Sequence, residues 1–163
     1  MPDTSGRAPS SLVSVVLPIH NQADHLERIV EQYVDALTAC GIGHEVILVP
    51  NGCSDASPAL AEDLSRRRPT VRCVTIAAPG WGGAVRTGIA SARGDLVAYT
   101  NSARTSPDDL VKAITFALTN PGVVIKVNRR IRESVVRRAG SLLFNLQCRV
   151  LFQLACCDVN GTP

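Results

Sequence analysis

The chain has 163 residues, of which 45% are hydrophobic and 19% are charged, which is the composition of one globular domain with its own core. Its formal net charge is only +3, and aromatic residues make up 4%, so the core must consist mainly of Val, Leu, Ile and Ala. No run reaches the roughly 18–20 apolar residues of a membrane-spanning helix. The spacings of the six cysteines and three histidines exclude the common zinc motifs.

Residues 1–11 are polar and rich in Pro, Ser and Gly, so we expect a disordered leader without a signal sequence. The cysteines form no Cys-x-x-Cys pair, which favours reduced cysteines that pack as small hydrophobic residues. We therefore expect a cytoplasmic protein with its domain over residues 12–163.

The first half of this domain alternates apolar strands with amphipathic helices. Residues 12–19 are nearly all apolar and are predicted to form a central strand. Proline cannot donate a ladder hydrogen bond, so we expect this strand to end at Pro18. Apolar residues at helical spacing predict a helix over 23–40. A second strand is expected at 45–49. Its exit loop, 50–55, contains an Asn-Gly turn and leads to a helix over 57–68.

The second half continues the alternation. We expect a strand at 71–77, a glycine-rich loop at 79–83, a helix at 84–92 and a strand at 96–99 that is apolar on both faces, as in a central parallel strand. Ser106 is a predicted N-cap, and Pro107 followed by two acids predicts a helix over 107–119. A fifth strand and one or two amphipathic helices are expected at 123–127 and 131–155.

This order predicts an α/β fold with a mostly parallel sheet. Ligands of such folds bind outside the carboxyl ends of the strands. We therefore expect a functional site at residues 100–104, after the fourth strand, and at residues 20–22, after the first.

Two further features suggest an anionic ligand. Glycines at 80, 82 and 83 before a helix would let backbone amides approach a phosphate, although Val85 at the third glycine position departs from the dinucleotide fingerprint. Five arginines also fall within ten residues, which favours a phosphate, a nucleotide or an anionic membrane surface over a solvated helix face. They are Arg129, Arg130, Arg132, Arg137 and Arg138.

Five segments match, in order, the motifs of one known family. Residues 13–22 are similar to a strand ending in Pro-x-x-Asn-Glu, and residues 46–55 to a strand followed by Asp-Asp-Gly-Ser-x-Asp. Residues 80–88 resemble Gly-Lys-Gly-x-Ala-x-Arg-x-Gly, and residues 92–110 resemble a strand followed by Asp-x-Asp-x-Gln-x-x-Pro. Residues 137–161 resemble the stretch before an acceptor-binding half. The chain thus resembles family 2 glycosyltransferases of the GT-A fold, in particular polyprenyl-phosphate (dolichol-phosphate) mannose and glucose synthases.

The resemblance implies a GT-A-like α/β domain, short at its C-terminus, that transfers a hexose from a nucleotide-diphosphate sugar to a polyprenyl phosphate or a glycan. In the family, the two acids of Asp-x-Asp hold Mg²⁺ or Mn²⁺ on the donor diphosphate. Here Thr100 and Ser102 take their places, and neither offers a carboxylate. Arg104 replaces the glutamine of the same motif. We therefore expect no metal cofactor, with Arg104 binding the diphosphate in its place.

The same departures leave an alternative open. A chain without the metal-binding acids could be a catalytically inactive binding or scaffold protein on this fold, because a metal ion contributes several kcal/mol to such a transition state.

The remaining departures also affect the donor site. Asn51 stands where the family has an acid that reads the base, and its carbonyl could still accept a hydrogen bond from a nucleobase N–H. Gln22 replaces a glutamate, and Trp81 replaces a lysine and could stack on a base or pack against the Pro18 strand end.

The resemblance implies the following sites. The donor-binding residues are Pro18, His20, Asn21, Gln22, Asn51, Asp55, Trp81, Gly82, Thr100, Asn101 and Ser102. The phosphate-binding residues are Arg129, Arg130, Arg137 and Ser141, and the catalytic residues are Arg104 and Asp158. We also expect peripheral membrane contact through residues 131–157, a homodimer as one option, and no nucleic-acid partner.

Overall fold

The structure, a computed structural model, describes residues 11–101, 105–127, 146–147 and 150–151. The chain divides into two compact units, Met1–Val123 and Val124–Pro163, and the first contains every strand and helix named below. Most of the expected leader and of the expected helices over 131–155 lies outside the described residues. Within the described part of the chain, no helix has the length and apolar character needed to cross a membrane.

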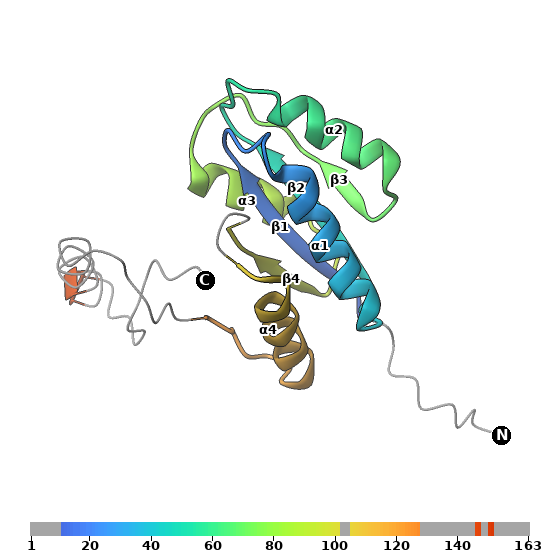
Figure 1. Cartoon of the computed structure of the whole chain (residues 1–163). Helices are drawn as coiled ribbons and strands as arrows, with labels where there is room; N and C mark the ends of the chain where they lie inside the picture. Colours follow the sequence, from blue (N-terminus) through green and yellow to red (C-terminus); the bar gives the residue numbers. More distant parts are fainter. Residues whose placement is uncertain (1–10, 102–104, 128–145, 148–149, 152–163) are drawn as a thin grey trace. The chain divides into compact units, whose positions relative to one another are not determined.

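The first unit is built on a parallel sheet in the order β3-β2-β1-β4 (Figure 1). The strands are β1 (Val13–Ile19), β2 (His44–Pro50), β3 (Val71–Cys73) and β4 (Leu96–Tyr99). The helices that alternate with them are α1 (Leu26–Ala39), α2 (Ser57–Arg67), α3 (Trp81–Ser91) and α4 (Pro107–Thr119). The predicted α/β fold with a parallel sheet is confirmed.

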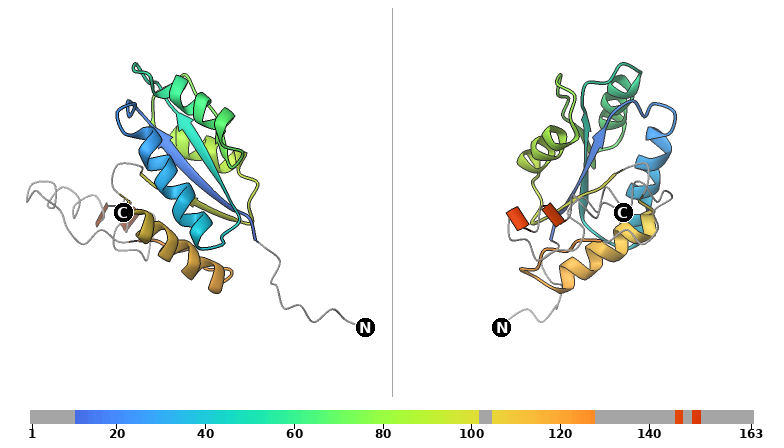
Figure 2. Two further views of the ribbon diagram at one scale, coloured as in Figure 1. Left: turned by 45° about the vertical axis from the view of Figure 1, so that its right-hand side comes forward. Right: turned by 90° about the vertical axis from the view of Figure 1, so that its left-hand side faces the viewer.

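Helices cover both faces of the sheet, with α3 on one face and α1, α2 and α4 on the other (Figure 2). The larger core lies under α1, where side chains such as Leu26, Val30 and Tyr33 are fully buried against Leu17 and Leu48. This is the apolar stripe that the helical spacing predicted. On the opposite face, Val16, Ile47 and Val49 pack with Ala84 of α3.

The prediction that the first strand ends at Pro18 is wrong, because β1 continues to Ile19. Successive residues of a strand direct their backbone polar groups to opposite neighbours, and Thr100 N donates to Val16 O on the β4 side. Pro18, two residues further, also faces the β4 side. The last β4 residue paired with β1 is Tyr99, opposite Val16, so the ladder requires no donor at Pro18.

The predicted central position of β4 is also wrong for the described sheet, in which β4 is an edge strand. Because α3 lies mainly over β1 and β2, Val97 and Tyr99 remain 38% and 46% exposed. Apolar residues on both faces were thus compatible with an edge strand.

Two other predicted strands differ from the structure. The strand expected at 71–77 is regular only to Cys73, although Ile76 N still donates to Pro50 O, so the chain follows β2 without a continuous ladder. Residues 123–127 form no strand. Val124 is 93% exposed there, because this apolar run has no partner strand among the described residues.

Candidate functional site

The loops that follow β1, β2 and β3 meet at the carboxyl edge of the sheet, and the Asn51 side chain joins them. Asn51 is 3% exposed, and its Nδ2 donates to Ile19 O at 2.7 Å and to Val49 O at 3.3 Å. Its Oδ1 accepts a hydrogen bond from Gly80 N at 3.1 Å. This corrects the expectation of an open acceptor at Asn51, because the amide is buried and bonded within the protein.

His20 and Asn21, directly after β1, are tied to the loop after β2. His20 Nδ1 lies 2.8 Å from Asn51 O, and the His20 side chain is exposed. Asn21 adopts a φ of 51°, a conformation that Asn tolerates better than most residues. Its Oδ1 accepts from Ser54 N at 2.8 Å. The two loops therefore form one hydrogen-bonded unit.

Asp55 and Ser57 extend this unit toward α1 and α2. The Asp55 carboxylate accepts from Ala23 N and from Ser57 N, each at 3.0 Å, and Ser57 Oγ accepts from Gln22 N at 2.8 Å. Burial of the carboxylate opposes its ionisation, but the hydrogen bonds from Ser57 and Ala23 prevail and lower the pKa of Asp55. In this structure Asp55 and Gln22 thus organise the loops. Sequence reasoning missed Ser57, whose signal was a serine immediately before Pro58 at a helix start.

The expected glycine loop is partly helical, because α3 begins at Trp81 and includes Gly82 in its first turn. Before it, Pro79 lies so close to Gly52 that a Cβ at Gly52 would be 2.5 Å from Pro79 Cβ. Gly82 is the opposite case, with no heavy atom within 4 Å of its would-be Cβ, so its backbone is accessible.

Trp81 is 47% exposed and contacts the ring of Tyr99 edge-on, with the ring centroids 5.7 Å apart. The contact joins the start of α3 to the end of β4. Whether Trp81 stacks on a base or packs against the Pro18 strand end stays a prediction. Pro18 itself is buried within β1. Its assignment as a donor-binding residue stays a prediction.

Thr100, at the first position of the altered Asp-x-Asp motif, points into the protein. It is 2% exposed, and its hydroxyl is hydrogen-bonded to that of Thr105 at 2.5 Å. Tyr33 OH donates to Thr105 O at 2.8 Å, and burial raises the pKa of Tyr33 to about 12, although this hydrogen bond lowers it. The Thr100 side chain is thus bonded within the protein, and its assignment as a donor-binding residue stays a prediction. Asn101, the next residue, is partly exposed.

The described residues do not fit a divalent cation. Thr100 offers no carboxylate and is enclosed, and no group of three or more His, Cys, Asp or Glu side chains among the described residues could hold a metal ion. Seven predicted site residues lie outside the described residues. They are Ser102, Arg104, Arg129, Arg130, Arg137, Ser141 and Asp158.

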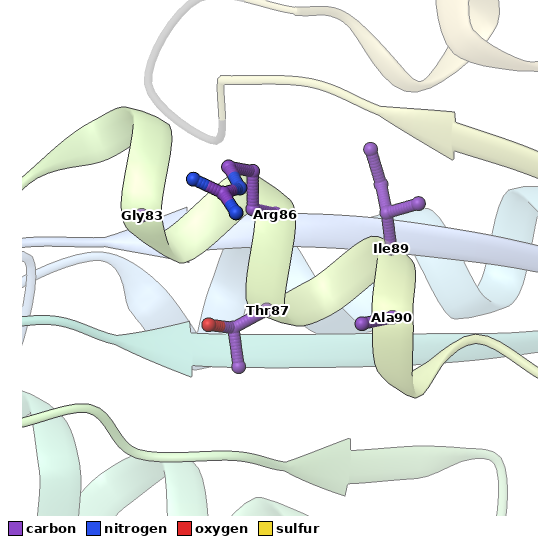
Figure 3. Close-up of a pocket in the computed structure, with 5 residues that line it drawn as sticks. All are labelled: Gly83, Arg86, Thr87, Ile89 and Ala90. Atoms are coloured by element: carbon purple, nitrogen blue, oxygen red, sulfur yellow. The ribbon is translucent and has the colours of Figure 1, made fainter.

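A hollow lies on the outer side of α3. Figure 3 shows the residues of α3 that line it, including Arg86, Thr87 and Ile89. The hollow is open to solvent, and Arg86 is its one charged lining residue among the described residues.

The family model described as glycosyl transferase family 2 matches residues 14–153. The chain belongs to glycosyl transferase family 2. The family expected from the ordered motifs is thus confirmed, and the matched range includes all eight elements except the first residue of β1.

A curated relative of this family 2 chain is the undecaprenyl-phosphate 4-deoxy-4-formamido-L-arabinose transferase of Edwardsiella ictaluri. The two are 28% identical over 137 residues, which is 82% of this chain and 42% of the relative. The chain therefore spans less than half the length of this relative.

Two solved structures resemble the chain in fold. Mannosyl-3-phosphoglycerate synthase from Rubrobacter xylanophilus has a TM-score of 0.66 at 24% identity, covering 83% of this chain and 47% of that one. A mannosyltransferase from Pyrobaculum calidifontis, in complex with GDP-Man and Mn²⁺, has a TM-score of 0.54 at 24% identity, covering 72% and 35%. The expected GT-A fold is confirmed.

Proposed function

We propose that this family 2 chain carries the donor site of a glycosyltransferase that moves a hexose from a nucleotide-diphosphate sugar to a polyprenyl phosphate. The acceptor class is supported by the Edwardsiella relative, whose name specifies undecaprenyl phosphate. The donor class is supported by the Pyrobaculum mannosyltransferase, which binds GDP-Man.

The observation that carries the proposal is the joining of three strand-exit loops at the carboxyl edge of a parallel sheet. Asn51 links the ends of β1 and β2 to Gly80, and His20 and Trp81 are exposed beside these links. Ligands of open α/β sheets bind at this edge. A nucleoside would lie against His20 and Trp81, and the donor phosphates would approach the accessible backbone at Gly82, where the helix dipole favours an anion.

We further propose that the transfer is independent of a metal ion and that Arg104 binds the donor diphosphate. The enclosed Thr100 supports this, because its hydroxyl is bonded to Thr105 and is not directed to a ligand. A guanidinium can donate hydrogen bonds to two phosphate oxygens at once and can stabilise a leaving diphosphate. Arg129, Arg130, Arg137 and Ser141 are proposed, from the sequence, as further phosphate ligands, and Asp158 as an acid near the acceptor.

Calorimetric titration of the chain with UDP- and GDP-sugars, in EDTA and in Mn²⁺, tests both proposals. We expect one donor to bind with similar affinity in both conditions. Arg104→Ala should weaken binding by about tenfold or more, because a charge-assisted pair contributes about 1.5–3 kcal/mol. The control is Arg66→Ala, which removes an exposed arginine of α2.

The outcomes separate the two proposals. Absence of binding in both conditions would reject the donor site. Binding that requires Mn²⁺ would reject metal independence and leave the donor site in place.

A further inference from the structure

We infer that His20 reads the base of the donor as a fixed hydrogen-bond acceptor and selects bases with a ring N–H, as in uracil and guanine. The inference rests on the proposed function, since it assigns a specificity to the same site. It also moves base recognition from the buried Asn51 amide to an exposed neighbour.

The position of the proton on His20 follows from its partner. Asn51 O is a carbonyl oxygen and can only accept, so Nδ1 of His20, 2.8 Å away, must carry the proton. In the neutral imidazole, Nε2 then has a lone pair and no proton. No described residue hydrogen-bonds to Nε2, and the His20 side chain is exposed. His20 therefore presents an acceptor to a ligand at this edge.

The backbone contact also fixes the ring. Asn51 N donates to Ile19 O at 2.9 Å, and the Asn51 side chain is held at both ends, so the carbonyl that holds His20 belongs to a rigid part of the sheet edge. A preorganised acceptor loses little entropy when it binds, which strengthens its preference for a matching donor.

Neighbouring acceptors are already used by the protein. Oδ1 of Asn51 is bonded to Gly80 N, and Oδ1 of Asn21 is bonded to Ser54 N. The two oxygens of Asp55 accept from Ala23 N and Ser57 N. The amide and carboxylate groups beside His20 thus stabilise the loops, and the imidazole remains available.

The acceptor divides the bases into two classes. Uracil has N3–H and guanine has N1–H, and each can donate to Nε2. Cytosine and adenine carry a lone pair at the corresponding ring nitrogen, which would face the lone pair of Nε2 and leave both unpaired. Such a mismatch in a binding site is strongly disfavoured.

The test is calorimetric titration of the full chain with UDP, GDP, CDP and ADP. We expect UDP or GDP to bind about tenfold tighter, or more, than CDP and ADP. His20→Asn can keep an N–H donor for Asn51 O but has no acceptor at the Nε2 position, so it should reduce the preference to about threefold or less. The matched control is His44→Asn, since His44 Nδ1 makes the same kind of contact, 2.8 Å from Ile42 O, at the opposite edge of the sheet.

The outcomes distinguish this inference from the proposed function. If no nucleotide binds the unaltered chain, the donor site fails and the inference fails with it. If nucleotides bind without preference, or if folded His20→Asn keeps the preference, the inference alone is overturned. A ring-N-methylated UDP or GDP provides a measurement without any substitution: binding about tenfold weaker is expected, and equal binding would overturn the inference.

Discussion

The buried Asn51 amide carries the hydrogen bonds that join the loops of the candidate site. Its two donors and its acceptor are matched to Ile19 O, Val49 O and Gly80 N. An aspartate, which the resemblance places here in the family, would lack the donors for both carbonyls. The protein therefore depends on the amide at this position for its loop structure.

Asn51→Asp should lower the free energy of unfolding at pH 7 by about 1–3 kcal/mol, because a carboxylate oxygen would face Ile19 O at a buried position. Urea denaturation measures the change. Ser54→Ala, an exposed change in the same loop, is the control and should stay within about 0.5 kcal/mol of the unaltered chain. An Asn51→Asp variant as stable as that control would contradict the structural role of the amide.

At the amino edge of the sheet, the Glu45 carboxylate joins neighbouring segments through hydrogen bonds, as the Asn51 amide does at the carboxyl edge. Its Oε1 accepts from Ser14 Oγ at 2.6 Å and from Arg93 N at 2.8 Å, and Arg72 donates to its Oε2 at 2.8 Å. Burial of the carboxyl would raise its pKa, but hydrogen bonds from Ser14, Arg72 and Arg93 outweigh burial and lower the pKa of Glu45 below its ordinary value of 4.5.

The lowered pKa of Glu45 determines in which direction the stability of the protein changes with pH. A carboxyl whose pKa is lower in the folded state stabilises the fold above its ordinary pKa, and the contribution disappears as the pH falls through the lowered value. Glu45→Gln should therefore be less stable than the unaltered chain by about 1–3 kcal/mol at pH 7, and the difference should shrink as the pH falls below 4.5. Denaturation at a series of pH values, with the exposed Glu62→Gln as control, measures this; a difference independent of pH would refute it.

At the level of whole elements, α3 lies against β1 because residue 88 is glycine. A Cβ at Gly88 would lie 2.2 Å from Cγ1 of Val16. This close approach brings the first turn of α3, with Trp81 and Gly82, to the carboxyl edge of the sheet.

Gly88→Ala should destabilise the protein by about 1–3 kcal/mol through overpacking. Val16→Ala removes the two methyl groups nearest to the new Cβ, so the double variant should recover part of that loss. Gly82→Ala is the matched control on the same helix, since nothing lies within 4 Å of its would-be Cβ. Additive effects of the Gly88 and Val16 changes in thermal denaturation would show that the two residues do not set the distance between α3 and β1.

Elements with local signals could be predicted from the sequence. The start of α4 is one example, since Ser106 accepts from Asp109 N as its N-cap and Pro107 occupies the first helical position. Strand ends could not be predicted as well, because they depend on partners. Pro18 is accommodated only because β4 ends opposite Val16.

In the candidate site, too, features with local sequence signals could be predicted and features that depend on distant partners could not. Its place at the carboxyl edge was predicted from the strand order, and His20 and Trp81 are exposed there. The enclosure of Thr100 depends on Thr105 and Tyr33, which the chain brings together only in three dimensions. The side-chain bonds of Thr100 could therefore not be predicted from its position in the motif.

For the molecule as a whole, we propose one donor site at the carboxyl edge of the sheet, with no metal ion there. Backbone amide chemical shifts of the ¹⁵N-labelled chain, titrated with UDP- or GDP-sugar in EDTA, test this most directly. We expect shift changes clustered at residues 20–22, 51–55 and 80–83, with residues 93–95 at the amino edge unaffected. Changes confined to Arg86, Thr87, Ile89 and Ala90 on the outer side of α3 would contradict this proposal, as would changes at the carboxyl edge that appear only after Mn²⁺ is added.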